Sequence, residues 1–391
     1  MRPAPSTAGA MTLAASIAML MGIAGCVTKN PQQIFRHEIR RHQDQAAFIP
    51  KIPCHPAAGK QNEWGALAGV LNYWGRRVSP VALETRFSSL PSGLHPYFTQ
   101  AAGLAGEMKL WASAASLPLE ALKIRVKAGV PIMTPLQDRL LDFDSRQYVI
   151  VAGFDDVSQK VFLIDGTPHG TIQDYGFFLK KWSVQRFAAL QICPPSAPTW
   201  TLSGAERLSR AGYYYAQGDY ASALQDYRQA VVMEYAPAEA LIGEGNAYRS
   251  LGDYEKAEEA YRSAIAADPR NGSGYNNLAY LLAERSKNPS EAVALARQAV
   301  VLDPSSPFAF DSLGFVLYQQ AQYKDAEQAF EKARSRARSH PLDVREAIAV
   351  HLVRNHLKSG QRHLACQVLA DLMRENPQYQ APDEFRGLLS E

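Results

Sequence analysis

The pattern GDYASALQDYRQA at residues 218–230 returns as GDYEKAEEAYRSA at residues 252–264, and this repetition decides the fold of the C-terminal half of the chain. The two copies begin 34 residues apart. In both, alanines recur on one helix face, where their small side chains let paired helices approach closely. Tyr227 and Tyr261 stand between the alanines and are expected to fill the gap between successive pairs. Each unit therefore needs a neighbour to bury its apolar face.

Weaker copies continue the pattern toward the C-terminus, with one inserted residue near Asn288. They are marked by small residues, aromatic residues and prolines: Ala279, Ala292, Ala299 and Pro304; Gly314, Tyr323, Ala326, Phe330 and Ala333; and Gly360, Ala365, Leu369 and Pro377. A 34-residue period of this kind resembles the tetratricopeptide repeat, a helix pair that stacks into a solenoid. The resemblance implies an all-α solenoid over residues 204–378, made of four repeats and a fifth capping repeat, followed by a tail over residues 379–391.

The same resemblance implies a binding surface. In tetratricopeptide repeats the first helix of each pair lines a concave groove, and this register places polar and aromatic side chains there: Asn246, Arg249, Asn276, Tyr280, Asp311, Phe315 and Tyr318. Such a mixture suits an extended peptide or a partner helix. For Phe315 and Tyr318, packing between repeats is the alternative role.

The N-terminal half is organised around IPCHPAAGKQNEWGALAGVLNYWG at residues 52–75. A short irregular lead precedes a predicted helix, which ends at Gly75 because glycine accepts the backbone turn that closes a helix. Further elements are expected as follows: helices over 79–87 and 100–115, a segment over 119–127, and strands over 130–134, 148–154, 161–164 and 187–193. Helices followed by an antiparallel sheet make an α+β domain, which we predict over residues 49–195.

This stretch resembles the first motif of the bacteriocin-processing, double-glycine cysteine peptidases, whose fold is papain-like. Laid on that motif without gaps, Ala57 falls at the oxyanion glutamine and Asn62 at the nucleophilic cysteine. The family's second motif matches QYVIVAGFD at residues 147–155 and places Gln147 at the catalytic histidine. Asp165 alone keeps the residue type of the family.

The resemblance therefore implies a domain with the fold of a peptidase and without its chemistry. A cysteine peptidase needs a thiolate, a base to hold it and a donor for the oxyanion. Asn62 supplies no thiol and Gln147 no titratable nitrogen, and losing either group alone costs such hydrolases several powers of ten in rate. Amides at Gln61, Asn62 and Gln147 are expected to line a cleft that can hydrogen-bond a peptide. A relic that binds nothing is the alternative.

A working peptidase that processes an exported peptide or protein is the rival function. Its nucleophile would be Cys54, which lies farther from the predicted helix than the cysteine of the family. A structural role is favoured instead: Cys54 and Cys193 flank the domain, so they form either a disulfide in an oxidising compartment or two separate thiols. Cys366 is expected in the core of a repeat.

The first 26 residues are typical of an export signal. Arg2 provides a positive start, residues 11–23 an apolar run, and Ile23-Ala24-Gly25-Cys26 resembles the lipobox in which the cysteine becomes lipidated. Val27 replaces the aspartate that retains lipoproteins at the inner membrane, so the resemblance implies the outer membrane, on its periplasmic face. An ordinary cleaved signal or an uncleaved anchor is the alternative, although the run is short for a bilayer span.

The remaining segments and the overall charge complete the expectation. Residues 27–48 are predicted to be a polar tether, and residues 196–203 a proline-containing linker. With 41 basic and 38 acidic residues, a net charge of +3 and no basic run, nothing favours nucleic acid. No zinc pattern, phosphate loop or dinucleotide motif is present, so no metal or cofactor is expected. We predict a non-catalytic outer-membrane lipoprotein that binds an exported or envelope-associated peptide or protein.

Overall fold

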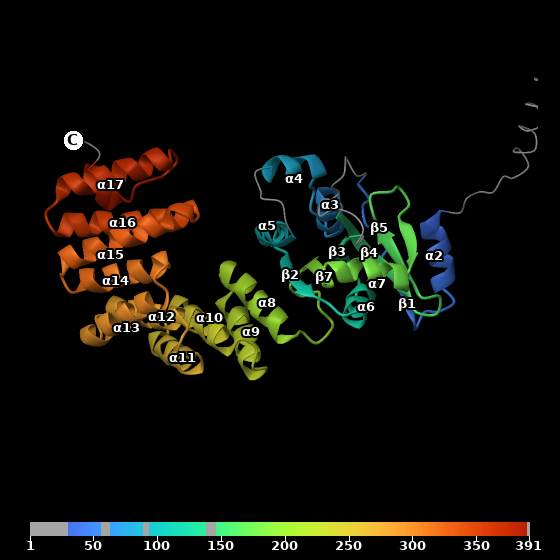
Figure 1. Cartoon of the computed structure of the whole chain (residues 1–391), viewed down its shortest axis with the longest axis horizontal. Coiled ribbons are helices and arrows are strands. Elements are labelled where there is room, and N and C mark those ends of the chain that lie inside the picture. The colour runs from blue at the N-terminus through green and yellow to red at the C-terminus, as the bar shows by residue number, and fades with distance from the viewer. Residues whose placement is uncertain (1–29, 56–62, 89–93, 138–145, 389–391) are drawn as a thin grey trace, which may run out of the picture. The chain divides into compact units, whose positions relative to one another are not determined.

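The computed structural model describes residues 30–55, 63–88, 94–137 and 146–388. The chain divides into two compact units, Met1–Thr201 and Leu202–Glu391, so the boundary falls inside the predicted linker (Figure 1). The first unit carries all the described strands, and the second is helical. The two units are considered in turn.

The N-terminal unit is built on an antiparallel sheet of seven strands. Six strands follow the order β2-β7-β3-β4-β5-β6, and β1 pairs with the last residues of β4. The strands are β1 (Ala46–Phe48), β2 (Trp111–Ser116), β3 (Ile132–Leu136), β4 (Gln147–Asp155), β5 (Lys160–Ile164), β6 (Thr171–Asp174) and β7 (Ala188–Cys193). The residues of β4 after Gln147 are all buried, and the helices over residues 63–73 and 119–127 both pack on this strand. That explains its nearly continuous apolar sequence.

Six described helices accompany the sheet: α2 (Pro31–Ile39), α3 (Glu63–Tyr73), α4 (Pro80–Arg86), α5 (Leu94–Glu107), α6 (Leu119–Lys127) and α7 (Tyr175–Val184). The helix predicted before Gly75 is α3, and Gly75 has the expected positive φ of 78°. A Cβ atom on Gly69 would lie 2.7 Å from the carbonyl oxygen of Pro53 and 3.0 Å from Ile150 Cδ1. This glycine therefore lets the lead segment and β4 close on α3.

The prediction that residues 27–48 form a tether was wrong for the described part of this segment. Asn30 caps α2 by accepting a hydrogen bond from the backbone of Gln32, and β1 extends the sheet. Phe35 is fully buried, with its ring centroid 5.6 Å from that of Phe162 and 6.0 Å from that of Phe48. The polar composition of the segment concealed one large apolar side chain that completes the core.

The helix predicted over residues 100–115 was also wrong in its second half. α5 ends at Glu107, and residues 111–116 form β2, which pairs with β7 in a register that places Trp111 opposite Cys193. Alanine-rich segments favour helix locally, but long-range pairing overrides that preference. The unit is thus an α+β assembly with strands and helices interspersed, and it is not clearly papain-like.

The C-terminal unit is a solenoid of five helix pairs. The pairs are α8 (Gly204–Ala216) with α9 (Tyr220–Val232), α10 (Pro237–Ser250) with α11 (Tyr254–Ala267), α12 (Gly272–Glu284) with α13 (Pro289–Leu302), α14 (Pro307–Gln319) with α15 (Tyr323–Arg336), and α16 (Leu342–Lys358) with α17 (Arg362–Glu375). Each helix packs on its partner and on the next pair. This confirms the predicted all-α repeat architecture and the number of its units.

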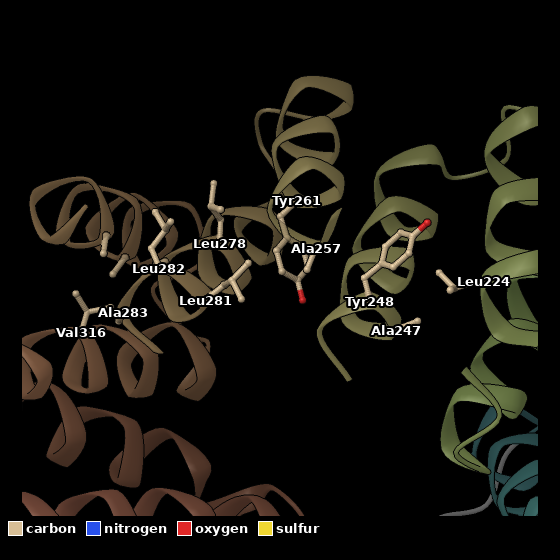
Figure 2. Packing of buried hydrophobic residues seen from close by; sticks show 13 residues of the cluster. Leu224, Ala247, Tyr248, Ala257, Tyr261, Leu278, Leu281, Leu282, Ala283 and Val316 are labelled. Atoms are coloured by element: carbon tan, nitrogen blue, oxygen red, sulfur yellow. The ribbon is translucent and has the colours of Figure 1, made fainter. Parts of the chain in front are cut away.

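Alanines, leucines and tyrosine rings build a core cluster of the repeats (Figure 2). Ala257, Ala292 and Ala296 are fully buried at helix crossings. A Cβ atom on Gly245 would lie 2.5 Å from the ring of Tyr261, so the ring of the second helix occupies the space beside the glycine of the first. The prediction placed these aromatic rings between repeats, whereas Tyr261 packs within its own pair.

The end of the chain is part of the core. The predicted tail contains a short 3-10 helix, η3 (Asp383–Leu388), in which Phe385 is fully buried and Leu388 is 6% exposed. Both pack in a cluster with Leu352 and Leu369 of the last pair. Because every unit of a solenoid leaves one face open, the residues after the last pair cover that face.

The predicted linker is not a free spacer. Within the first unit, the Arg125 guanidinium lies 5.1 Å above the ring of Trp200. On the other side of the boundary, Leu202 is buried and Ser203 caps α8 together with Glu206 in a capping box. In the part of the chain that the structure describes, no helix is both long and apolar enough to cross a bilayer.

Candidate functional site

Successive first helices of the pairs contribute a continuous row of side chains, which we call the contact row: Arg249, Tyr280, Phe315 and His351 from α10, α12, α14 and α16. The Arg249 guanidinium lies 4.9 Å above the Tyr280 ring. Tyr280 stacks on Phe315 with centroids 4.3 Å apart and planes 12° apart. The centroids of Phe315 and His351 are 5.6 Å apart. The row therefore spans four repeats on the surface formed by the first helices.

Carboxylates bind both ends of the contact row. Arg249 donates from Nε to Glu284 Oε2 at 2.8 Å and from Nη2 to Oε1 at 3.0 Å, a two-point geometry that fixes the guanidinium. These hydrogen bonds raise the pKa of Arg249. At the other end, His351 Nδ1 lies 2.8 Å from Asp311 Oδ1. The row is thus preorganised before any ligand arrives.

An amide network adjoins the row. Asn246 Oδ1 accepts from the Tyr261 hydroxyl at 2.7 Å and from Asn277 Nδ2 at 3.0 Å, while Asn276 Nδ2 donates to Asn277 Oδ1 at 3.0 Å. The Asn246 amide nitrogen has no hydrogen bond among the described residues. A side-chain amide has two N–H donors, so Asn246 keeps hydrogen-bonding capacity at this surface.

The structure joins the predicted surface residues in different ways. Arg249, Tyr280 and Phe315 lie in the contact row, Asp311 binds it through His351, and Asn246 and Asn276 belong to the amide network. Tyr318 lies outside the row, with its ring centroid 6.0 Å from that of Tyr323. Sequence reasoning missed His351 and Glu284. The only signal for His351 was its place on the first helix of the last and least regular repeat.

The peptidase-like positions lie partly outside the described residues, which exclude Ala57, Gln61, Asn62 and the predicted lipidation site Cys26. Gln147 opens β4, and its Nε2 donates to the backbone carbonyl of Asp165 at 3.3 Å. The start of β4 and the end of β5 are therefore neighbours, as expected for two paired antiparallel strands.

The Asp165 carboxylate is engaged locally. Oδ1 accepts from the Thr167 hydroxyl at 2.6 Å and from the Thr167 backbone N–H at 3.1 Å, and Oδ2 accepts from the Thr171 hydroxyl at 3.0 Å. These are the bonds of a turn-capping residue. Gln147 is the neighbour of Asp165 at the start of β4.

Cys54 lies in the same neighbourhood, where its Sγ donates to the carbonyl of Thr167 at 3.0 Å. Burial raises the pKa of the Cys54 thiol, and the negative charge of Asp165 adds to the increase. The adjacent His55 places its Nε2 3.1 Å from Asn72 Nδ2. A catalytic cysteine needs a lowered pKa, so this environment opposes thiolate formation.

No disulfide joins Cys54 and Cys193. Cys193 is the last residue of β7. Cys54 contacts Thr167 in the turn after β5, and β3 and β4 lie between β7 and β5 in the sheet. Three strand spacings amount to roughly 14 Å, whereas a disulfide needs Cα atoms closer than about 7 Å. Among the described residues, no three histidine, cysteine, aspartate or glutamate side chains form a cluster suited to a metal ion.

Comparison with known proteins places the repeats in a family. Family models of the tetratricopeptide repeat match residues 208–271, 242–307 and 309–340. A TPR repeat-containing protein of Pseudomonas aeruginosa is 36% identical over 78 residues, which cover 20% of this chain and 13% of that protein. The chain therefore spans only about an eighth of the length of this relative.

The chain is also similar to solved structures, one of which is described as a TPR protein. A thermophilic TPR protein of Thermus thermophilus is 21% identical with a TM-score of 0.39, and the match covers 45% of this chain and 93% of that one. The pilF protein of Pseudomonas aeruginosa is 18% identical with a TM-score of 0.38, covering 47% and 82%. With the family matches above, the C-terminal unit of this protein contains tetratricopeptide repeats, an architecture of protein–protein interaction.

Proposed function

We propose that this protein is a non-catalytic binding or assembly factor that holds a peptide or protein client on the first helices of its repeats. The observation that carries the proposal is the contact row, a stacked and charge-compensated surface spanning four repeats. Its aromatic rings remain half-buried, so a client side chain can still cover them. Contact with flat aromatic surface is favourable at low entropic cost because these rings are already fixed.

The amide network beside the row supplies the polar half of such recognition. An extended peptide presents alternating N–H and C=O groups, and side-chain amides can both donate to and accept from them. Asn246 already uses its oxygen within the protein, so its remaining donors suit a backbone carbonyl of the client. The combination favours a peptide over a small apolar ligand.

The proposal includes a non-catalytic N-terminal unit derived from a papain-like peptidase scaffold. Three observations support it: Gln147 stands beside Asp165, the Asp165 carboxylate is engaged in a turn, and the Cys54 thiol has a raised pKa. All three oppose the rival peptidase function. The motif match to double-glycine peptidases remains the basis for the scaffold.

Lipid attachment at Cys26 and an outer-membrane location on the periplasmic side complete the proposal. They rest on the sequence of residues 1–27, which lie outside the described structure. Incorporation of radiolabelled palmitate by the full chain, lost in Cys26→Ser, would support attachment at this residue. Equal labelling of the variant would contradict it.

The binding function is tested with the purified full chain and a random dodecapeptide display library. Selection on the wild type should enrich peptides that the Tyr280→Ala, Phe315→Ala double variant fails to retain, because the stacked surface is gone. Tyr235→Ala removes an aromatic side chain that is 45% exposed and lies away from the row, so it should retain them. Equal retention by all three proteins would refute the proposal.

A further inference from the structure

The segment after the last helix pair carries a carboxylate to the surface of the first helices. Phe385 and Leu388 anchor η3 in the core, and Arg362 Nη2 donates to the carbonyl of Gly387 at 2.8 Å. From this anchored turn, Glu384 Oε1 accepts from Arg354 Nε at 3.0 Å and from Nη2 at 2.7 Å. Glu384 thus binds a first-helix arginine from outside the repeats.

Arg354 belongs to the electrostatic environment of the contact row. Burial raises the pKa of Tyr280, and the positive charges of Arg249 and Arg354 act against that increase. Arg354 is on α16, the helix that also carries His351. Arg354 follows His351 by three residues, a spacing that places two side chains on the same face of a helix.

The two arginines near the row obtain their carboxylates differently. Arg249 is bound by Glu284, which belongs to the neighbouring first helix, and the two side chains are 37% and 35% exposed. Arg354 is bound by Glu384, which needs only a side-chain rotation to leave, since Phe385 keeps η3 in place. Both partners are about half exposed, at 42% and 50%. An exposed ion pair of this kind stabilises a protein by about 0.2–1 kcal/mol, so a competitor can displace it.

Resting on the proposed binding function, we propose that Arg354 is a carboxylate subsite of the client surface and that Glu384 occupies it within the molecule as a competitor. The client then carries a carboxylate at the α16 end of the contact row, from an acidic side chain or from its own C-terminus. Glu384 lowers the affinity for such clients and admits only those that also engage the aromatic rings.

Three variants of the full chain test this subsite. Glu384→Gln removes the competing charge, and Arg354→Gln removes the subsite. Glu375→Gln is the matched control, because Glu375 pairs at 2.7 Å with Arg345, which lies on the same helix as Arg354. Each is used to select from the random dodecapeptide display library. Enriched peptides are then synthesised with fluorescein, with free or amidated C-termini, and with acidic residues replaced by their amides.

We expect Glu384→Gln to bind the acidic peptides about 1.5-fold to 5-fold more tightly than the wild type in fluorescence anisotropy, the range that an exposed ion pair allows. Arg354→Gln should lose the preference for acidic over amide peptides, and Glu375→Gln should match the wild type. The gain should shrink in high salt. The amidated peptides decide whether the carboxylate is terminal or a side chain.

Unchanged or weaker binding by Glu384→Gln, or an acidic preference that survives Arg354→Gln, would overturn the inference. Peptides that depend on Tyr280 but show no acidic preference would overturn it and leave the binding function intact. Absence of any selected peptide for wild type and Glu384→Gln would overturn both. Far-UV circular dichroism and thermal melting show that each variant is folded.

Discussion

The two units of this chain build their cores over different distances in sequence. In the repeats, a helix packs on its partner and on the next pair, so each contact joins residues within one or two periods. In the N-terminal unit, β2 pairs with β7 and β1 with β4, which join segments far apart in the chain. A local pattern can therefore reveal the first kind of core, whereas the second depends on pairings that no single stretch specifies.

The chain offers separate probes for the two units. All five tryptophans, Trp64, Trp74, Trp111, Trp182 and Trp200, lie in the N-terminal unit. Tryptophan fluorescence therefore reports on that unit, while helical circular dichroism is dominated by the ten helices of the repeats. Each stability prediction below can thus be assigned to one unit.

The largest expected effect breaks the long-range core. Phe35→Ala removes a fully buried ring from the cluster with Phe48 and Phe162, which should lower the free energy of unfolding by about 3–5 kcal/mol. Urea unfolding followed by tryptophan fluorescence measures it. His37→Ala, an exposed change on the same helix, is the control and should stay within about 0.5 kcal/mol. If Phe35→Ala changed the free energy of unfolding as little as His37→Ala does, residues 27–48 would be a tether after all.

The second-largest expected effect is the loss of a buried ion pair in the repeats, whose core joins segments close in sequence. Asp226 is 1% exposed, and its carboxylate accepts from Arg207 and Arg210 at 2.6 Å each. Asp226→Asn leaves two guanidinium groups without their counter-charge, which should cost about 2–3 kcal/mol, at the lower end for buried pairs because both arginines keep some solvent contact. Circular dichroism should show the loss, with the tryptophan transition in place. Glu331→Gln, in a half-exposed pair with Arg334, should change little.

A smaller effect concerns acid stability of the N-terminal unit. Burial raises the pKa of Asp155, but hydrogen bonds from Ser158, from the Val157 backbone and from His42 outweigh it and lower the pKa below its usual value. Asp155 then binds fewer protons in the folded state than in the unfolded state, where the pKa of an aspartate is about 3.9. This stabilisation is present above that pH and is lost as the pH falls through the lower folded value.

Asp155→Asn should therefore flatten the dependence of tryptophan-detected stability on pH below about 4, by an amount on the order of 1 kcal/mol. Urea unfolding at several pH values from acid to neutral measures it. An unchanged slope would show that the carboxylate is not ionised by these partners. Asp174→Asn, whose side chain is exposed, is the comparison variant.

The smallest effect separates scaffold from enzyme. Because burial and Asp165 raise its pKa, the Cys54 thiol should react with iodoacetamide at neutral pH more slowly than a cysteine in an unfolded peptide. Mass spectrometry after timed labelling measures the rate. Cys54→Ala removes the thiol and controls for other sites. Fast labelling of Cys54 that does not depend on pH would favour the peptidase function.

Prediction from sequence succeeded where the signal was local. The helix predicted to end at Gly75 is present, and this glycine has a positive φ. The repeat register also placed Arg249, Tyr280 and Phe315 on one surface, because the first helices of successive pairs line the same side of a solenoid. It could not supply His351, since α16 has 17 residues against 13 in α14 and so departs from the period.

Prediction failed where a contact from a distant segment decided the outcome. Residues 111–116 are rich in alanine and read as helix until β7 pairs with them. Residues 31–48 are polar on average, and they join the fold through the burial of Phe35 against the sheet and the pairing of β1 with β4. The bond between Arg354 and Glu384 could not be foreseen, because it depends on where the last turn is anchored.

The buried Phe385 has a consequence for how the array ends. A stack of helix pairs can in principle grow, since the open face of the last pair offers another molecule the same apolar surface that joins its own units. The turn at residues 383–388 covers that face with the chain's own side chains. A protein truncated before residue 383 would expose apolar surface at Leu352 and Leu369, and its repeats would tend to self-associate through that end.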